Sequence, residues 1–424
     1  MKQTIFTPAD ILLPKKRDTR SMEKWSVVAC DQYTSDRAYW SAVDAFVGDA
    51  PSTLRIILPE LYLNDADKDA RIAAVGRKTE EYGDSVLECF PDTMLYIERT
   101  MKNGKIRHGV IGAVDLEAYD YNKGSTSAVR ATEGTVLSRI PPRVQIRQNA
   151  VLEAPHVMLL IDDPENRLIG AAAKAGSRAP VYDFDLMQNG GHLAGWTMNA
   201  EETAAVDEAL AVLGDREAFT KRYGADREPL VIAVGDGNHS LATAKACYEK
   251  IKAELGADAA LRHPARWALA EIVNLHDDAL EFEPIYRVLF GTTRGELRDA
   301  MKAYYPALTA EDGNDGHRFV MLDKAGEEVL RVPSPSAQLP VGTLQAFLDA
   351  FLAEHKDVSC DYIHGTDAVR ALASQDDTVG FLFDGMEKND LFRTVIYDGA
   401  LPRKTFSMGE ADEKRYYLEC RKIR

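Results

Sequence analysis

The chain has 424 residues, of which 45% are hydrophobic and 28% are charged, and its formal net charge is −16. A chain of this length and composition can bury two or three hydrophobic cores, which argues against a disordered protein. The acidic balance also argues against a nucleic-acid partner, because phosphate backbones are bound by basic surfaces. We therefore expect a globular protein whose partners are small molecules.

The cysteines and the apolar runs indicate the compartment. Five cysteines are scattered without a CxxC pair, at Cys30, Cys89, Cys247, Cys360 and Cys420. This pattern is typical of reduced thiols, most of them small buried side chains. No run approaches the roughly 18 apolar residues that a membrane helix needs, and the first ten residues contain no long apolar stretch. We expect a cytoplasmic protein without a membrane partner.

The first half of the chain alternates helical and strand patterns. We expect helices at 35–46 and 66–84, and strands at 54–58, 94–98, 107–115 and 157–161. A hairpin of 181–187 and 193–198 follows, with Asn189, Gly190 and Gly191 at its turn. Two further helices, 200–213 and 216–223, lead to an apolar strand at 230–234.

The second half continues this mixture. A helix from about residue 238 and a strand at 266–275 form a strand, helix, strand unit with 230–234. Patterned segments at 327–332, 344–354, 380–383 and 391–396 indicate a separate mixed α/β lobe. The predicted class is therefore mixed α/β (α+β), in three regions: 1–120, 121–290 and 291–424.

A polar turn stands between the strand at 230–234 and the following helix. It consists of Asp236, Gly237, Asn238, His239 and Ser240. Glycine permits backbone angles that other residues resist, and Asn238 or Ser240 can cap the helix. The N–H groups and the positive dipole end of a helix start attract phosphate. The turn predicts an anion site, with an ordinary capped helix as the alternative.

Two groups of basic residues stand out in this acidic chain. Between positions 130 and 147 a single carboxylate, Glu133, is surrounded by Arg130, Arg139, Arg143 and Arg147. A later group joins two cations to two hydroxyls, Arg403, Lys404, Thr405 and Ser407. Exposed arginines usually pair with surface carboxylates, which is the plain interpretation. Beside small polar motifs, the same residues suit a small anionic ligand.

The three polar motifs, 130–135, 236–240 and 402–407, occur in an order that resembles the bacterial domain-of-unknown-function family 1015 over nearly the full length. That family is similar to the free-serine kinases of the ParB/sulfiredoxin superfamily. The resemblance implies a ParB/sulfiredoxin-like core around the turn from Asp236 to Ser240. It also implies additional mixed α/β lobes, the last of which contributes the loop from Arg403 to Ser407.

The resemblance implies roles for single residues. Glu133 matches the glutamate that takes the proton of the serine hydroxyl, and such a base accelerates transfer about 10²- to 10⁴-fold. Asp236, Gly237 and His239 match the kinase pattern Asp-Gly-His-His-Arg. Asp236 and His239 are therefore the further catalytic candidates, and Asp236 is the candidate ligand of Mg²⁺.

The same resemblance implies two further groups of candidates, one that binds phosphate and one that binds the substrate. The phosphate-binding candidates are Arg130, Arg139, Arg143, Gly237, Asn238, Ser240, Arg403 and Lys404, and the substrate-binding candidates are Thr405 and Ser407. Two positions depart from the kinase pattern, because Asn238 replaces a histidine and Ser240 replaces an arginine. A hydroxyl cannot copy a bidentate guanidinium contact, so the phosphate must be bound by other groups, such as Lys245 or the pair of Arg139 and Arg143.

These features favour a phosphotransferase that converts free L-serine to O-phosphoserine. The chain has no GxxxxGK[ST] loop, so inorganic pyrophosphate is the favoured donor, with ATP or ADP as the alternative. Two further functions stay open, namely a non-catalytic phosphate or nucleotide sensor and a phosphate-ester hydrolase. The expected partners are serine and the phosphate donor, and the oligomeric state stays open.

Overall fold

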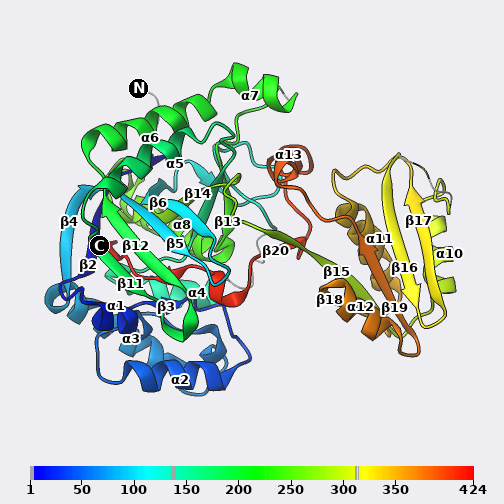
Figure 1. Ribbon diagram of the computed structural model, residues 1–424, viewed down its shortest axis with the longest axis horizontal. Helices are drawn as coiled ribbons and strands as arrows, with labels where there is room; N and C mark the ends of the chain where they lie inside the picture. The colour runs from blue at the N-terminus through cyan, green and yellow to red at the C-terminus, as the bar shows by residue number, and fades with distance from the viewer. Residues whose placement is uncertain (1–3, 135–139, 225, 311–312, 314) are drawn as a thin grey trace. The chain divides into compact units, whose positions relative to one another are not determined.

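The computed structural model describes residues 4–134, 140–224, 226–310, 313 and 315–424 (Figure 1). The contacts between residues divide the chain into two compact units. Unit 1 comprises residues 1–280 together with Glu410–Arg424, and unit 2 comprises Glu281–Gly409. The chain therefore leaves unit 1 and returns to it. These units do not follow the boundaries near residues 120 and 290, and the three-region division stays a prediction.

A mixed sheet forms the centre of unit 1. In the described chain its strands lie in the order β11 (Tyr182–Asp185), β12 (His192–Thr197), β5 (Leu95–Thr100), β6 (Ile106–Asp115), β14 (Trp267–Asn274), β10 (Met158–Ile161), β13 (Ile232–Asp236), β8 (Val129–Ala131) and β7 (Tyr119–Asp120), and β1 (Phe6–Thr7) pairs with β6. Three pairs are parallel: β10 with β14, β13 with β8, and β7 with β8. The mixed α/β class is confirmed.

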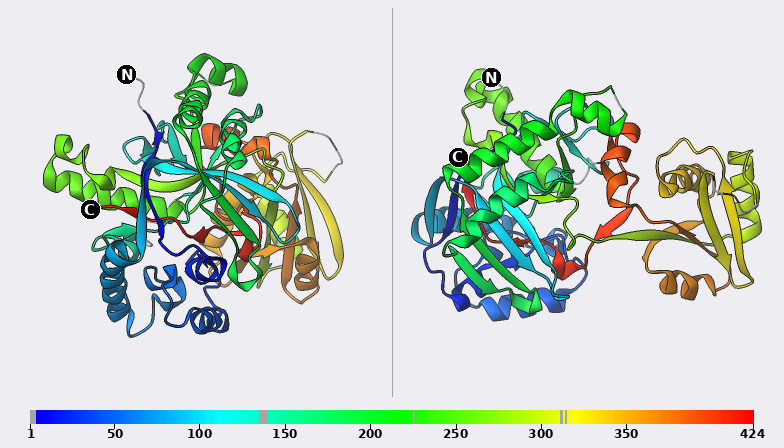
Figure 2. Two further views of the ribbon diagram at one scale, coloured as in Figure 1. Left: turned by 60° about the vertical axis from the view of Figure 1, so that its left-hand side comes forward. Right: turned by 45° about the horizontal axis from the view of Figure 1, so that its top comes forward.

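Helices cover both faces of this sheet. They are α1 (Thr19–Trp25), α2 (Arg37–Val47), α3 (Lys68–Ser85), α4 (Ile140–Arg147), α5 (Arg167–Ala172), α6 (Ala200–Leu213), α7 (Arg216–Tyr223), α8 (Asn238–Leu255) and α9 (Ala257–Ala260). In both views of Figure 2 the blue helices α1 to α3 stay on one side of the sheet and the green α6 on the other.

Side chains alternate between two hydrophobic cores along the strands, as a period of two requires. On β5, Tyr96 belongs to the core that α5, α6 and α8 complete. Its neighbours Leu95 and Ile97 belong to the core that α1 and α2 complete. The sheet is therefore buried on both faces. Polar side chains that bind a ligand are expected at the edges where the strands end.

Short strands tie the segment Glu410–Arg424 into unit 1. β21 (Tyr416–Tyr417) pairs with β3 (Val27–Val28), and β22 (Arg421–Lys422) pairs with β9 (Leu152–Glu153). A third two-stranded sheet joins β2 (Ala9–Pro14) to β4 (Leu87–Thr93). Residues from the two ends of the printed sequence thus complete one core.

Unit 2 has its own mixed fold. Its described strands are β15 (Phe282–Phe290), β16 (His317–Asp323), β17 (Gly326–Val332), β18 (Ser359–His364), β19 (Thr378–Phe383) and β20 (Phe406–Met408), and its helices are α10 (Arg294–Tyr304), α11 (Pro340–Glu354), α12 (Thr366–Ala373) and α13 (Lys388–Asp398). The sheet order is β17, β16, β19, β15, β18, and β20 pairs with β15.

Most expected elements are confirmed, and two expectations change. The apolar run 54–58 forms no strand. Its first two residues belong instead to the 3₁₀ turn η1 (Thr53–Arg55). The strand, helix, strand unit around α8 exists, but β10 lies between β13 and β14 in the sheet. In the described parts of the chain, no helix has both the length and the apolar character that crossing a membrane requires.

Candidate functional site

Two of the predicted motifs meet at one edge of the sheet in unit 1. β8 and β13 are parallel neighbours, with Ala131 opposite Val234, so both strands end at the same edge. Thr132 and Asn238 join the segments that follow. The Thr132 N–H donates to Asn238 Oδ1 at 3.3 Å, and Asn238 Nδ2 lies 3.3 Å from Thr132 Oγ1. Glu133, which follows Thr132, therefore stands beside the turn and is half-buried.

The turn itself is shaped by Gly237. Its φ of 77° lies in the left-handed region, and a Cβ there would come within 3.1 Å of the Cα of Val157. Gly237 is the N-cap of α8, and no side chain caps the helix. The expected capping by Asn238 or Ser240 is wrong, because the Asn238 amide is used on Thr132 and on the carbonyl of Val234.

Three proposed residues of the turn lie at the start of an 18-residue helix. Asp236 ends β13, and its Oδ1 accepts the Gly237 N–H at 2.9 Å. His239 and Ser240 are half-buried in the first turn of α8, and the His239 carbonyl accepts the hydroxyl of Thr243 at 2.7 Å. The positive end of the helix dipole thus faces the edge where Asp236 lies, which favours an anion there.

A buried histidine that was not predicted shares this edge. β10 pairs with β13 so that Met158 lies opposite Asp236, and His156 precedes Met158 by two positions. Nδ1 of His156 lies 2.8 Å from the hydroxyl of Tyr417, and Nε2 lies 3.7 Å from Oδ2 of Asp31. The site therefore contains a histidine between a phenol and a carboxylate.

Opposite charges act on both members of the pair formed by His156 and Asp31. Burial would lower the pKa of His156, but the charges of Asp31 and Asp236 raise it above its ordinary value. Burial would raise the pKa of Asp31, but His156 and Lys414 bring it well below its ordinary value. Asp31 is therefore ionised at neutral pH and draws the proton of His156 toward itself.

The segment Glu410–Arg424 supplies a cation to the same edge. Nζ of Lys414 lies 3.5 Å from Oδ2 of Asp236, and the two side chains are 14% and 21% exposed. The Ala29 N–H donates to the carbonyl of Arg415 at 3.1 Å, next to the pairing of β21 with β3. Because Lys414 precedes β21 and Asp31 follows β3, this pairing brings both residues to the same edge.

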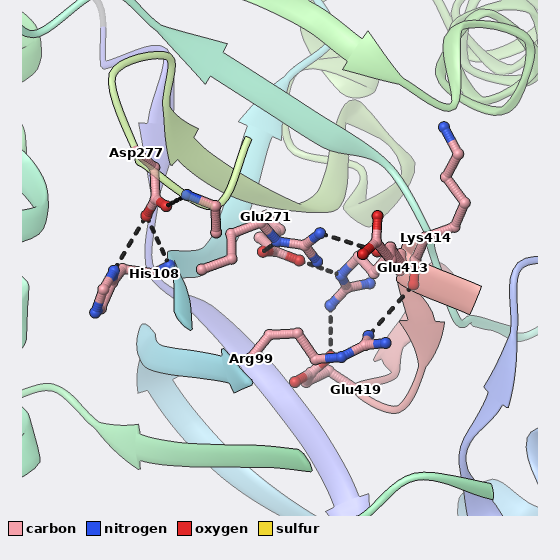
Figure 3. Close-up of polar contacts among 10 residues, drawn as sticks. Arg99, His108, Glu271, Asp277, Glu413, Lys414 and Glu419 are labelled. Atoms are coloured by element: carbon pink, nitrogen blue, oxygen red, sulfur yellow. Dashed lines mark hydrogen bonds and ion pairs between the residues drawn. The ribbon is translucent and has the colours of Figure 1, made fainter. Parts of the chain in front are cut away.

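A buried charge network lies behind Lys414 (Figure 3). Arg415 donates to Glu271 at 2.9 Å and to Glu419 at 2.5 Å, and all three side chains are at most 4% exposed. Arg107 adds a second cation 3.5 Å from Glu271. Burial lowers the pKa of the nearby Arg99 to about 10. Burying such charged pairs costs desolvation energy. Removing one partner strongly destabilises the folded protein, because the other charge stays buried and unpaired.

The predicted arginines have different surroundings. Arg130 is buried and donates to the carbonyls of Ser127 at 2.6 Å and Glu228 at 2.7 Å, so its guanidinium serves the backbone. Arg143 on α4 forms an ion pair with Glu60, whose N–H donates to the carbonyl of Cys30. Arg139 lies outside the described residues.

Lys245 is also engaged away from the turn. Its ammonium donates to the carbonyl of Leu116 at 2.8 Å and lies 2.7 Å from Glu249. The expectation that Lys245 compensates for the missing arginine at Ser240 is therefore not met by these contacts. The ammonium of Lys414, in contrast, lies at the turn, 3.5 Å from Oδ2 of Asp236.

The third motif lies in unit 2. Arg403 donates to Tyr362 at 2.6 Å and to Asp349 at 2.5 Å, and Lys404 is exposed with a left-handed φ of 54°. The carbonyls of both residues accept hydrogen bonds from Arg287, which is fully buried. The loop is thus held from beneath while its cations face outward.

The two hydroxyls of this loop are used within it. Thr405 is 2% exposed and donates to the carbonyl of Pro402 at 2.7 Å, and Ser407 donates to the carbonyl of Gly409 at 3.0 Å. Their expected contact with substrate would need these bonds to rearrange. That the loop shares a pocket with Glu133 and Asp236 stays a prediction.

Asp236 fits a magnesium ion only in a phosphate complex. Among the residues that the structure describes, no group of three or more His, Cys, Asp or Glu side chains could hold a metal. Mg²⁺ often takes one or two carboxylates and completes its shell with phosphate oxygens and water. Asp236, at the start of α8, has the chemistry for that arrangement.

Comparisons with known proteins place the chain in a family. No curated protein matches it. A free serine kinase in complex with AMP is 13% identical, with a TM-score of 0.38 over 76% of this chain and 93% of that chain. A conserved hypothetical protein from Pyrococcus furiosus is 12% identical, with a TM-score of 0.33 over 72% of this chain and 90% of that chain.

A third solved structure is similarly distant. SbnI with a C-terminal truncation from Staphylococcus aureus is 10% identical, with a TM-score of 0.36 over 70% of this chain and 83% of that chain. At such identity no residue role is transferred. The model of the family of proteins of unknown function DUF1015 matches residues 12–351, and the chain belongs to this family.

Proposed function

We propose that the chain is a phosphotransferase that phosphorylates a small hydroxyl metabolite, namely free L-serine, with inorganic pyrophosphate as donor. The observation that carries the proposal is that β8 and β13 end at one edge, so that the segments carrying Glu133 and Asp236 both lie near the N-terminus of α8. A candidate base, a helix dipole and an acidic residue suited to Mg²⁺ thus occupy one edge of the sheet. Phosphoryl transfer depends mainly on such positioning and on charge neutralisation.

The reaction can be written with the residues of this edge. The serine Oγ attacks the terminal phosphorus of pyrophosphate while its proton passes to the Glu133 carboxylate. The new Oγ–P bond forms as the bond to the bridging oxygen breaks, and inorganic phosphate leaves. The start of α8, from Gly237 to Ser240, would neutralise the phosphates, and a bound Mg²⁺ would spread their negative charge. Arg143 would contribute only after its release from Glu60.

The donor is chosen from what the sequence lacks. Without a GxxxxGK[ST] loop, a nucleotide would need another grip, whereas pyrophosphate needs only contacts to phosphate. The solved structures of free serine kinases include complexes with AMP and ADP, so ATP and ADP are the alternative donors to be tested.

The test is a donor screen. The purified chain would be incubated with L-serine, Mg²⁺ and, in turn, pyrophosphate, ATP and ADP, and O-phosphoserine would be measured by mass spectrometry. We expect phosphoserine with pyrophosphate and a decrease of kcat by about 10²- to 10⁴-fold in Glu133→Gln. Glu80→Gln, an exposed glutamate on α3, is the matched control and should retain full activity.

Four results would decide against the proposal. Absence of phosphoserine with every donor, or full activity in Glu133→Gln, would exclude this mechanism. A thermal shift with pyrophosphate or serine but no turnover would indicate a sensor. Phosphate released from phosphoserine alone would indicate a hydrolase.

A further inference from the structure

We infer that Lys414 is the phosphate-binding cation of the turn, and that its ammonium moves from Asp236 to the terminal phosphate when a diphosphate donor binds. The inference rests on the proposed function for its class of ligand, a diphosphate. It assigns a phosphate-binding ammonium to the returning segment Glu410–Arg424, since the turn from Asp236 to Ser240 contains neither lysine nor arginine.

Other described cations close to the turn are committed to protein groups. Arg130, opposite Ala233 in the parallel pair of β8 and β13, donates to two backbone carbonyls. Lys245 donates to the carbonyl of Leu116, and Arg143 is paired with Glu60. Lys414 differs because its carboxylate partner, Asp236, belongs to the turn itself.

The geometry between Lys414 and Asp236 leaves room for exchange. Their closest charged atoms are 3.5 Å apart, longer than the 2.7–2.9 Å or so of a charge-assisted hydrogen bond. Both side chains are partly exposed, so a ligand can reach them. A lysine ammonium is a point charge on a flexible stem, and a diphosphate with several negative charges attracts it more strongly than one carboxylate does.

The backbone beneath Lys414 is fixed, which confines the movement to the side chain. Arg99 donates to the carbonyls of Asp412 at 2.8 Å and Lys414 at 3.3 Å, and Arg107 donates to the carbonyl of Glu413 at 3.1 Å. Figure 3 shows the side chain of Lys414 pointing away from this network. The two arginines thus act as positioning residues for Lys414.

The transfer has a consequence for Asp236. Once the ammonium contacts phosphate, Oδ2 of Asp236 loses its cationic neighbour and becomes available to a second positive group. A phosphate-bound Mg²⁺ and the ammonium group of an amino acid both have that charge. Donor binding would therefore prepare Asp236 for its own role in the reaction.

The test separates phosphate binding from simple neutralisation of Asp236. Binding of pyrophosphate, without serine, would be measured by isothermal titration calorimetry at several salt concentrations for wild type, Lys414→Met and the double variant Lys414→Met/Asp236→Asn. We expect both variants to bind at least about 10-fold more weakly and with a shallower salt dependence. Lys422→Met, an exposed lysine of the same segment, is the matched control and should bind like wild type. Circular dichroism melts would establish that each variant is folded.

Two results would overturn the inference: wild-type affinity in Lys414→Met, or recovery of affinity in the double variant. ADP and ATP are tested in parallel, and binding of none of the three ligands by the wild type would also overturn it. Lys414-dependent binding of pyrophosphate without any phosphoserine would instead contradict the proposed function and leave this inference standing. The two hypotheses can therefore fail separately.

Discussion

Nε2 of His156 lies 3.7 Å from Oδ2 of Asp31, next to the core that segments from both ends of the printed sequence complete. The phenol of Tyr417 lies on the other side of the imidazole, 2.8 Å from Nδ1. The Cys30 N–H donates to the same phenol at 3.2 Å. The histidine is thus held between two strand ends, and its carboxylate partner favours the charged form of the ring.

The pair formed by His156 and Asp31 predicts a pH window of stability. The pKa of His156 is raised above 6.5, so its contribution is complete below pH 6.5 and is lost as the pH rises through the folded-state pKa. The pKa of Asp31 is lowered below 3.8, so its contribution is present above that pH and is lost in acid. The pair should contribute most between about pH 4 and 6.5.

Urea unfolding at pH 6 and pH 9 tests this window. We expect the difference in free energy of unfolding between wild type and His156→Gln to be larger at pH 6, by about 1.4 kcal/mol for each unit by which the pKa is raised. In Asp31→Asn the NMR titration of the His156 ring should move to lower pH. An equal difference at both pH values would contradict the prediction.

The glycines at the two ends of α8 differ in what a side chain would meet. Gly237 and Gly256 have φ values of 77° and 81°, but an added Cβ meets the Val157 backbone only at Gly237 and meets nothing within 4 Å at Gly256. Through its backbone angles alone, alanine should cost about 1 kcal/mol of unfolding free energy at Gly237, where ψ is 26°. At Gly256, where ψ is 159°, it should cost about 1–3 kcal/mol, because that region is nearly restricted to glycine.

Gly237→Ala should cost a further ~1–3 kcal/mol beyond its backbone angle, because the chain near Val157 must shift. Denaturant unfolding of the variant measures the total loss directly. A loss of only about 1 kcal/mol would show that the close approach of Val157 to the turn does not constrain this position.

Arg415 should be among the most sensitive positions of unit 1. Arg415→Met leaves the buried carboxylates of Glu271 and Glu419 without their main cation, which should cost about 3–5 kcal/mol. Adding Glu271→Gln removes one unpaired charge and should restore part of the loss. Urea unfolding of the single and double variants gives the coupling energy, and strict additivity would argue against the pair.

The strained backbone of Lys404 predicts that two substitutions at this position differ in stability but not in activity. Lys404→Gly and Lys404→Ala remove the same ammonium, but only glycine relieves the left-handed φ of 54°. Lys404→Gly should therefore be more stable than Lys404→Ala by about 1 kcal/mol. If Lys404 contacts the donor, both variants should lose serine phosphorylation equally. Full activity in either variant would remove Lys404 from the proposed site.

Local signals explain which elements the sequence predicts well. The helix expected at 200–213 matches α6, because Asn199 and Glu202 form a capping box that is readable from the sequence. The run 54–58 is apolar but is not a strand. Thr53 Oγ1 donates to the Trp25 carbonyl at 2.8 Å, and Ser52 caps the 3₁₀ turn there. A short apolar run does not distinguish a buried strand from a buried turn, because either kind of segment is apolar when it is buried.

The site is predictable only where its residues follow one strand closely. Glu133 and Asp236 each come just after a strand, and the parallel pairing of β8 and β13 joins them. Lys414 and Asp31 meet through the pairing of β3 with β21, which links distant segments and has no local signal. His156 had a signal, since it directly precedes the apolar strand that became β10. This position indicates the end of a strand, but the sequence does not show that Asp31 and Tyr417 contact the histidine.

The return of the chain to unit 1 has a consequence for its synthesis. A ribosome that has translated through Leu280 has produced β8, β13 and α8, but neither β21 nor Lys414. Unit 2 must be made before the segment that places a cation beside Asp236 emerges. A nascent chain that has not yet reached Glu410 therefore lacks β21, β22 and the charge at the turn, so that the proposed site is assembled only after unit 2 has been translated.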